Sequence, residues 1–149
     1  MTPDVIIARA AGTKPLRAFG DEVTMLVSGE QTGGKYAAGI AVTPPGGGPP
    51  PHYHTNEDEM FYILEGRLSF LANGEWHEAG PGDYVFAPRN SVHTFKNIGD
   101  HPSRILLHAA PAGFEVFFAK CADEFAKDGP PDMGKLVAIA AEHGIHFVS

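Results

Sequence analysis

The sequence predicts an all-β fold, and three observations lead to this prediction. The apolar residues fall into short runs of strand length, separated by turn-forming residues, and the chain contains 18 glycines and 13 prolines. The Asn73-Gly74 pair lies between two such runs and is a strong signal for a β-hairpin. Helical periodicity is found only after residue 118. Many short strands with turns between them are typical of an antiparallel sandwich or barrel.

The predicted elements follow one another along a single domain that covers residues 1–149. Strands are expected at 15–19, 22–27, 36–43, 59–65, 68–72, 83–87, 91–97, 103–110 and 113–118. Two amphipathic helices are expected at 119–128 and 135–143, and each ends at glycine, Gly129 and Gly144 respectively. We expect six to eight antiparallel strands to form a barrel or flattened sandwich, with both helices packed outside it.

Two segments of the chain carry a candidate metal site. They read Gly46-x5-His52-x-His54-x4-Glu59-x6-Gly66 and Gly82-x5-Pro88-x-Asn90-x2-His93-x3-Asn97. His52 and His54 are two residues apart, so they project to the same face of an extended strand. The polar run 55–58 is expected to bend the chain and to change the register before Glu59. Both histidine segments are predicted to be neighbouring strands, which aim their rings at a common point.

The chemistry of these side chains suits a first-row divalent metal. Nitrogen donors favour Fe, Ni, Cu, Zn or Co, and a carboxylate oxygen also allows Mn. We therefore predict that His52, His54, Glu59 and His93 bind one such ion, whose identity the sequence leaves open. Three acidic neighbours of Glu59 do not have its spacing from His54 in the first segment. We expect them to lie in a solvated stretch: Glu57, Asp58 and Glu65. Five histidines lie outside both segments, and we expect them to be structural: His77, His101, His108, His143 and His146.

The two segments resemble the two sequence motifs of the cupin superfamily, with motif 1 at 46–66 and motif 2 at 82–97. Asn90 departs from the motif, since this position usually carries glycine. Segments 87–97, 111–118 and 140–145 also resemble small single-domain cupins of the quercetin dioxygenase-like type. The resemblance implies one cupin domain over 1–149, built as a double-stranded β-helix or jelly-roll barrel with a helical C-terminal tail at 119–144.

Several functions are compatible with such a site. A metal on these ligands keeps one or two positions open for a chelating substrate, O₂ or water. We expect an oxygenase, specifically a dioxygenase, that acts on a small aromatic or enolisable molecule, with Glu59 as the catalytic base. The alternatives are a non-redox isomerase, cyclase or lyase, and a non-catalytic small-molecule-binding cupin. Seven residues are candidates for an apolar substrate pocket: Phe61, Ile63, Phe70, Tyr84, Phe86, Phe95 and Phe114.

Composition and charge narrow the partners and the compartment. The formal net charge of −7, without a basic cluster, argues against a nucleic acid partner. The longest apolar runs have strand length, and the apolar stretch 5–8 is too short for a secretory signal. Cys121 is the only cysteine, which fits a reducing compartment. We expect a cytoplasmic protein that does not bind membranes.

Two further expectations concern single features of the chain. Segment 59–65 has apolar side chains on both faces, whereas a strand covered on one side needs them on only one. We expect its second face to be covered by a partner in a homodimer, by the C-terminal helices or by the N-terminal strands. Asn90 is predicted to adopt the left-handed conformation, which asparagine tolerates best among non-glycine residues, and to take no part in the chemistry.

Overall fold

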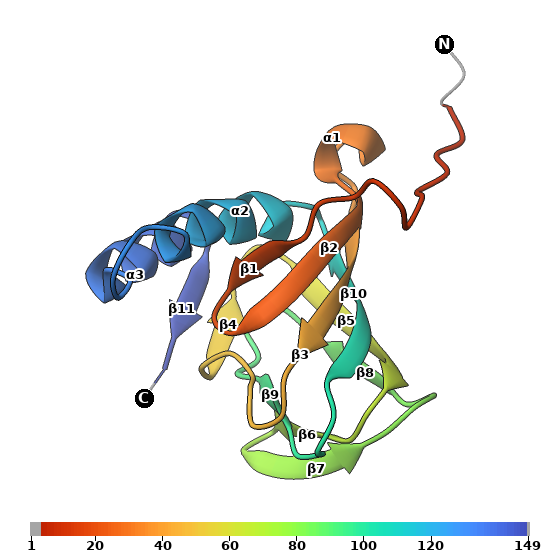
Figure 1. Ribbon diagram of the computed structural model, residues 1–149, viewed down its shortest axis with the longest axis vertical. Helices are drawn as coiled ribbons and strands as arrows, with labels where there is room; N and C mark the ends of the chain where they lie inside the picture. The colour runs from red at the N-terminus through yellow and green to blue at the C-terminus, as the bar shows by residue number, and fades with distance from the viewer. Residues whose placement is uncertain (1–3, 149) are drawn as a thin grey trace.

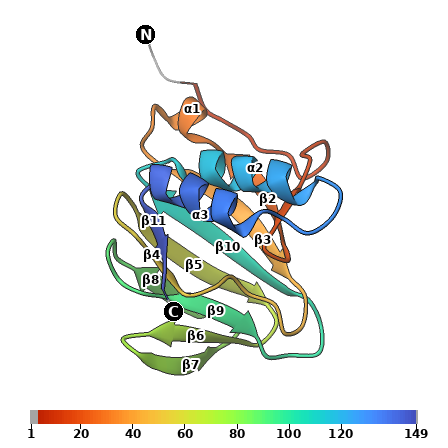
Figure 2. The ribbon, with the colours of Figure 1, turned by 90° about the vertical axis from the view of Figure 1, so that its left-hand side faces the viewer.

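The computed structural model describes residues 4–148 and has two facing layers (Figures 1 and 2). The first layer is a six-stranded antiparallel sheet with the strand order β1-β2-β3-β10-β5-β8. Its strands are β1 Leu16–Ala18, β2 Asp21–Val27, β3 Ala37–Thr43, β5 Asp58–Glu65, β8 Tyr84–Ala87 and β10 Ser103–Ala110. A one-turn helix, α1 Gly29–Thr32, connects β2 to β3.

The second layer combines two small antiparallel sheets with two helices. The sheets have the orders β7-β6-β9 and β11-β4. The elements are β4 His52–His54, β6 Leu68–Ala72, β7 Glu75–Ala79, β9 Thr94–Asn97, β11 Ile145–Phe147, α2 Phe114–Phe125 and α3 Met133–Glu142. In Figure 2 the helices lie in front of β2, β3 and β10, and the small sheets continue the same layer below them. The predicted all-β fold with short C-terminal helices is confirmed.

The core lies between the two layers, because the strands of the large sheet turn alternate residues inward. On β10, for example, Ile105 and Leu107 are buried while Arg104 is exposed. One core cluster joins the helices to the large sheet: Ala18, Val23, Ala41, Phe117, Phe118, Cys121, Leu136, Ala140 and Ile145. The other lies between the sheets: Phe61, Ile63, Leu68, Phe70, Ala87, Phe95, Ile105 and Leu107. Burying each large apolar side chain stabilises the fold by about 1.5–3 kcal/mol.

The C-terminal helices differ from the prediction in extent and in position. Residues 113–118, predicted as a strand, contain the start of α2, with Gly113 at its N-cap. Aromatic residues favour strands, but the buried side chains of this segment recur at helical spacing, as Phe114, Phe117, Phe118 and Cys121 do. The expectation that the helices pack outside the barrel is also wrong. They complete the second layer, because three phenylalanines of α2 line the cavity between the layers.

The predicted hairpin at Asn73-Gly74 is confirmed, although its second strand was not predicted. Asn73 and Gly74 have φ angles of 55° and 80°, as a two-residue hairpin turn requires, and β6 pairs with β7 across them. Four of the five β7 residues are exposed, so the strand has no apolar alternation that would identify it. No helix within residues 4–148 is long and apolar enough to cross a membrane.

Candidate metal centre

The structure brings together the four residues predicted to bind a metal. His52 and His54 lie on β4, Glu59 lies on β5, and His93 immediately precedes β9. Each offers one ligand atom, and these atoms all lie within 4.8 Å of one another. Two ligand atoms about 2.0–2.2 Å from a single ion are at most about 4.4 Å apart, so the group is slightly wider than a formed site and a shift of a few tenths of an ångström would close it. His54, Glu59 and His93 are buried and His52 is partly buried, so the group lies inside the sandwich.

Backbone pairing places the two histidine segments side by side, as predicted. His52 donates its backbone N–H to His93 (3.2 Å), and His93 donates to His52 (2.9 Å). The centres of these two imidazole rings are 4.7 Å apart. The predicted bend follows β4 at Thr55 and Asn56, and β5 begins at Asp58. The bend changes the register, so Glu59 reaches the same point as the histidines.

All three histidines are oriented by a hydrogen bond at Nδ1. The partners are the Pro50 carbonyl for His52 (2.7 Å), Glu57 Oε1 for His54 (2.6 Å) and the Ser91 carbonyl for His93 (3.0 Å). Because these oxygens accept, Nδ1 carries the hydrogen and Nε2 keeps its lone pair for a metal. The same pattern of ring orientation is seen in metal sites generally, where a second group fixes each histidine ligand.

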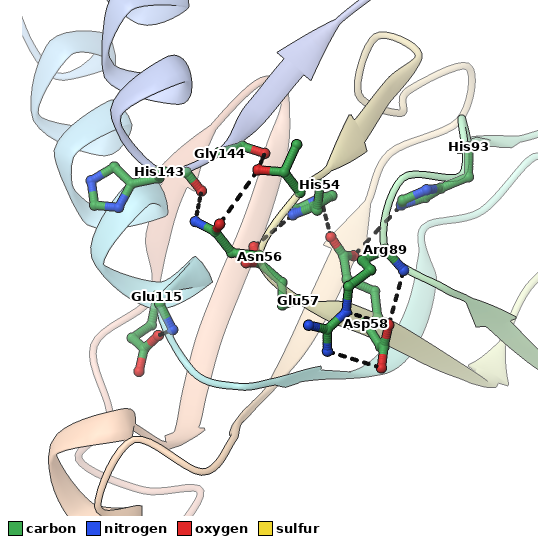
Figure 3. A network of polar contacts seen from close by, with 12 residues as sticks. His54, Asn56, Glu57, Asp58, Arg89, His93, Glu115, His143 and Gly144 are labelled. Carbon is green, nitrogen blue, oxygen red and sulfur yellow. Dashed lines mark hydrogen bonds and ion pairs between the residues drawn. The ribbon is translucent and has the colours of Figure 1, made fainter.

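Glu57 does not belong to a solvated stretch, contrary to the prediction. Its side chain is 3% exposed and bonds to His54, so it orients a candidate ligand (Figure 3). Its two acidic neighbours are engaged elsewhere. Asp58 accepts from the backbone N–H and the guanidinium of Arg89 (2.9 and 3.2 Å), and Glu65 accepts from Arg104 (3.1 Å). Neither belongs to the group of candidate ligands.

Unpartnered polar atoms show that these residues fit a bound cation. His54 Nε2, His93 Nε2 and Glu59 Oε1 are buried and have no hydrogen-bond partner among the described residues. His54 Nε2 and Glu59 Oε1 are in close contact, and His93 Nε2 lies 3.8 Å from Glu59 Oε2. Leaving one such atom unsatisfied costs about 1–3 kcal/mol. A divalent cation between them would satisfy all three.

The electrostatics of the group also suit a cation. Burial lowers the pKa of His52 to about 4, although the charge of Glu59 opposes this shift. Burial acts in the same direction on His54, but Glu59 and Glu57 outweigh it and raise the pKa of His54 to about 9. At neutral pH a bound cation would therefore take the place of the second proton of this ring, on Nε2. Burial would raise the pKa of Glu59, but the positive charges of the adjacent His54 and His93 rings hold it well below its usual value. Glu59 is therefore ionised at neutral pH, as a ligand or a base must be.

An aromatic cavity adjoins the four residues. Phe61, Phe95 and Phe114 line it as predicted, whereas Ile63 and Phe70 belong to the core. The prediction is wrong for Tyr84 and Phe86, which lie on the outer face of β8 and are 59% and 55% exposed. Four lining phenylalanines were not predicted: Phe19, Phe117, Phe118 and Phe147. The helical spacing of Phe114, Phe117 and Phe118 could have identified α2, but the position of Phe19 depends on packing between distant elements.

Two smaller expectations are also decided by the structure. Asn90 has a φ of 72°, so the predicted left-handed conformation is confirmed. Its backbone N–H donates to the His54 carbonyl (2.6 Å), which ties the second motif to the first. The apolar segment around His108 also predicts a core position for this histidine, and that prediction is wrong. His108 is partly buried, and its ring centre lies 6.1 Å from that of Tyr36.

Comparison with known proteins agrees with this fold. A family model described as a cupin domain matches residues 39–108. Quercetin 2,3-dioxygenase of Bacillus subtilis (strain 168) is 29% identical over 107 residues, which are 71% of this chain and 32% of that protein. The chain therefore spans about a third of the length of this relative.

Two solved structures show the same fold. A predicted oxalate decarboxylase from Thermotoga maritima has a TM-score of 0.67 and 25% identity, with 71% of this chain and 99% of that chain covered. The polyketide cyclase RemF from Streptomyces resistomycificus has a TM-score of 0.62 and 23% identity, with 72% and 80% covered. The structure is therefore a β-sandwich that encloses four side chains able to donate ligand atoms to a metal. The chain has the cupin fold, with a cupin domain matched over residues 39–108, and its four His and Glu residues are positioned to hold a metal ion.

Proposed function

We propose that this protein is a metal-dependent oxygenase, specifically a dioxygenase, acting on a small aromatic or enolisable molecule. The observation that carries the proposal is the convergence of unpartnered donor atoms of His54, Glu59 and His93 beside an aromatic cavity. A bound first-row metal supplies a Lewis acid and, for Fe, Mn, Co, Ni or Cu, a redox centre. Which of these metals, or Zn, belongs to the site is left to the experiments below.

The residues around the site have separate roles in this proposal. The phenylalanine side chains exclude water and favour a flat, apolar ligand. Glu59 is ionised at neutral pH and lies among the ligand atoms, so it either completes the metal site or accepts a proton from a substrate hydroxyl or enol. Similarity to part of a quercetin 2,3-dioxygenase supports the oxygenase class. The alternatives, a non-redox isomerase, cyclase or lyase and a non-catalytic binding protein, differ from it in measurable ways.

Metal content tests the site itself. We expect His52→Ala to reduce the bound metal by about tenfold or more, because it removes one imidazole ligand. His77 lies on the exposed strand β7, and His146 stacks on Tyr53 with ring centres 5.1 Å apart. His77→Ala and His146→Ala should therefore retain the metal. Elemental analysis of the three purified variants beside the unchanged protein decides this, and equal metal loss in all of them would contradict the assignment.

Oxygen consumption separates the candidate functions. The metal-free protein is loaded with Fe, Mn, Co, Ni, Cu or Zn in turn and mixed with flavonols, catechols and enolisable ketones in an oxygen electrode. The proposal expects O₂ uptake that needs a redox-active metal and is lost in His52→Ala. Substrate conversion at the same rate under argon would favour the non-redox enzyme. Ligand binding without conversion, and unchanged by chelation, would favour the binding protein.

We also propose that the chain forms a homodimer in the cytoplasm. Three covers were predicted for the second face of β5, and two of them do not reach it. The helices pack on the opposite face of the sheet, and the N-terminal strand β1 lies at the far edge of the sheet from β5. The outer residues Tyr62, Tyr84 and Phe86 are exposed. A second copy of the chain is the remaining cover among those predicted. The single cysteine supports a reducing compartment.

A further inference from the structure

The hairpin of β1 and β2 carries two unusual residues, Phe19 and Asp21, that line the cavity. Phe19 and Gly20 form its two-residue turn, with φ angles of 55° and 81°. A phenylalanine in the left-handed region is an outlier, which the surrounding structure must hold in place. Its ring is held by Phe117, Phe125 and Phe147, with centres 6.3, 5.1 and 5.9 Å away. Asp21 follows the turn, and both Phe19 and Asp21 line the cavity of the candidate metal centre.

Asp21 is a polar side chain in surroundings that do not satisfy it. It is 7% exposed, and its Oδ1 has no hydrogen-bond partner among the described residues. It shares the inward face of β2 with Val23, as the alternation of a strand requires. Its neighbours around the cavity are mainly apolar, including Phe19, Val23 and Ala41. Buried polar atoms are normally hydrogen-bonded, so an orphaned carboxylate oxygen on a cavity wall needs an explanation.

The protonation state of the Asp21 carboxyl can change near neutral pH. Burial raises the pKa of Asp21 to about 6, and the nearby Thr43 hydroxyl, whose Oγ1 is also buried without a hydrogen-bond partner among the described residues, offsets only part of the rise. Asp21 also borders a surface groove, which gives its carboxyl a route to solvent. The nearby charges on that side, Arg17 and Glu22, form an ion pair with each other (3.0 Å). On the cavity side, the charged or titratable groups are His52, His54, Glu59 and His93.

We propose that Asp21 is a second binding group for the small molecule held at the metal centre, and that it selects ligands with a hydroxyl or carbonyl group remote from their metal-binding end. The aromatic side chains then contact the apolar part of the ligand between these two polar ends. Asp21 donates to a carbonyl when protonated and accepts from a hydroxyl when ionised. This assignment rests on the proposed metal-bound ligand, but it does not depend on whether the reaction uses O₂.

Thermal stability first tests whether Asp21 serves folding instead. A carboxyl whose folded pKa is raised opposes folding increasingly as the pH rises from its unfolded value of 3.8 through about 6. We therefore measure the Tm of Asp21→Asn minus the Tm of the unchanged protein at pH 4.5 and at pH 7.5. This difference should be more positive at pH 7.5 than at pH 4.5, by about 3 °C or more. Glu22→Gln, on the outer face of the same strand, is the matched control without this gain. A Tm lowered equally at both pH values would assign Asp21 to the fold and overturn the proposal.

Ligand discrimination then tests the binding role directly. The metal-loaded protein is titrated calorimetrically with two pairs of chelating hydroxyketones, each differing by one remote hydroxyl. The short pair is kojic acid and 5-hydroxy-2-methyl-4-pyranone, and the long pair is 3,4′-dihydroxyflavone and 3-hydroxyflavone. In at least one pair, the hydroxylated member should bind the unchanged protein about tenfold more tightly. Asp21→Leu should lose this preference while keeping its metal content and its affinity for the other member.

The outcomes distinguish this assignment from the proposed function. A preference that survives in Asp21→Leu, or no preference in either pair, overturns the role of Asp21 even if O₂ uptake is found. A preference that depends on Asp21 supports it even if no oxygen is consumed. Loss of metal from Asp21→Leu would also contradict the proposal, because it would place Asp21 in the metal site itself.

Discussion

At the scale of single residues, the site depends on groups that orient the candidate ligands as much as on the ligands themselves. Two of the three histidines use backbone carbonyls for orientation, which no substitution of a side chain removes directly. His54 instead uses the buried carboxylate of Glu57, 2.6 Å from its Nδ1. Glu57 is therefore the position where orientation can be changed without removing a ligand.

We expect Glu57→Ala to weaken metal binding by about 10–100-fold, the usual effect of losing a partner that orients a ligand. The reason is that His54 loses the acceptor that fixes both its ring and the hydrogen on Nδ1. Competition with a chromogenic chelator measures the affinity. Glu65→Ala, at an exposed position on the same strand β5, is the control and should bind metal normally. Unchanged affinity in Glu57→Ala would show that the ring is held by packing alone.

The conformation of Asn90 leads to a second prediction at this scale. Because its φ is 72°, a β-branched residue there is strained, and Asn90→Val should destabilise the fold by about 1–2 kcal/mol. Asn90→Gly should retain stability, metal and activity, since glycine adopts this conformation readily. Chemical denaturation of both variants measures the difference. A stable Asn90→Val protein, or a loss of activity in Asn90→Gly, would contradict a purely structural role.

At the scale of elements, the predictions succeeded where one local pattern determined the outcome. The Asn73-Gly74 hairpin and the bend after His54 follow from short sequences that have few other conformations. The convergence of the four candidate ligands was predicted from two segments whose spacing resembles the cupin motifs. The start of α2 was missed because its aromatic residues suit a strand equally well, and only their spacing indicates a helix. Phe19 and Asp21 reach the cavity through contacts between elements distant in sequence, which no local pattern encodes.

The helical tail is held by polar contacts at two places. At one end, Thr55 and Asn56 donate hydrogen bonds to the Gly144 and His143 carbonyls (2.7 and 3.1 Å), which joins the end of α3 to the bend beside the candidate metal centre (Figure 3). At the junction of the two helices, Glu124 of α2 accepts from Lys127 (2.8 Å) and pairs with Lys135 of α3 (3.1 Å). The tail is thereby connected to the site as well as to the core.

We expect Glu124→Gln to lower the thermal stability at pH 7. Hydrogen bonds from Lys127, Lys135 and the Asp132 backbone lower the pKa of Glu124 to about 2. A depressed carboxylate pKa stabilises the folded state above the unfolded value of 4.5, and this contribution is lost as the pH falls toward 2. The Tm difference between the variant and the unchanged protein should therefore shrink below pH 4.5. A difference that stays constant from pH 7 to pH 3 would mean that packing, and not charge, is responsible.

At the scale of the whole molecule, the two faces of the large sheet differ in how far other elements cover them. The inner face is covered by the small sheets and the helices, whereas the outer face of β5 and β8 is uncovered within residues 4–148. Pairing across these strands places Tyr62 beside Tyr84 and Met60 beside Phe86. A contiguous apolar area of this kind is typical of an interface.

The proposed homodimer leads to the last prediction. A dimer formed through the outer face of β5 and β8 would bury Phe86, which is 55% exposed in the single chain. Phe86→Glu would place a charge in that interface, so it should convert the dimer to a monomer, because a buried unpaired charge is strongly unfavourable. Val137 is 52% exposed on α3, away from this face, and Val137→Glu is the matched control that should remain dimeric. Light scattering coupled to size-exclusion chromatography gives the masses. An unchanged protein that is already monomeric at micromolar concentration would leave this face for a different partner, and a Phe86→Glu dimer would move the interface elsewhere on the molecule.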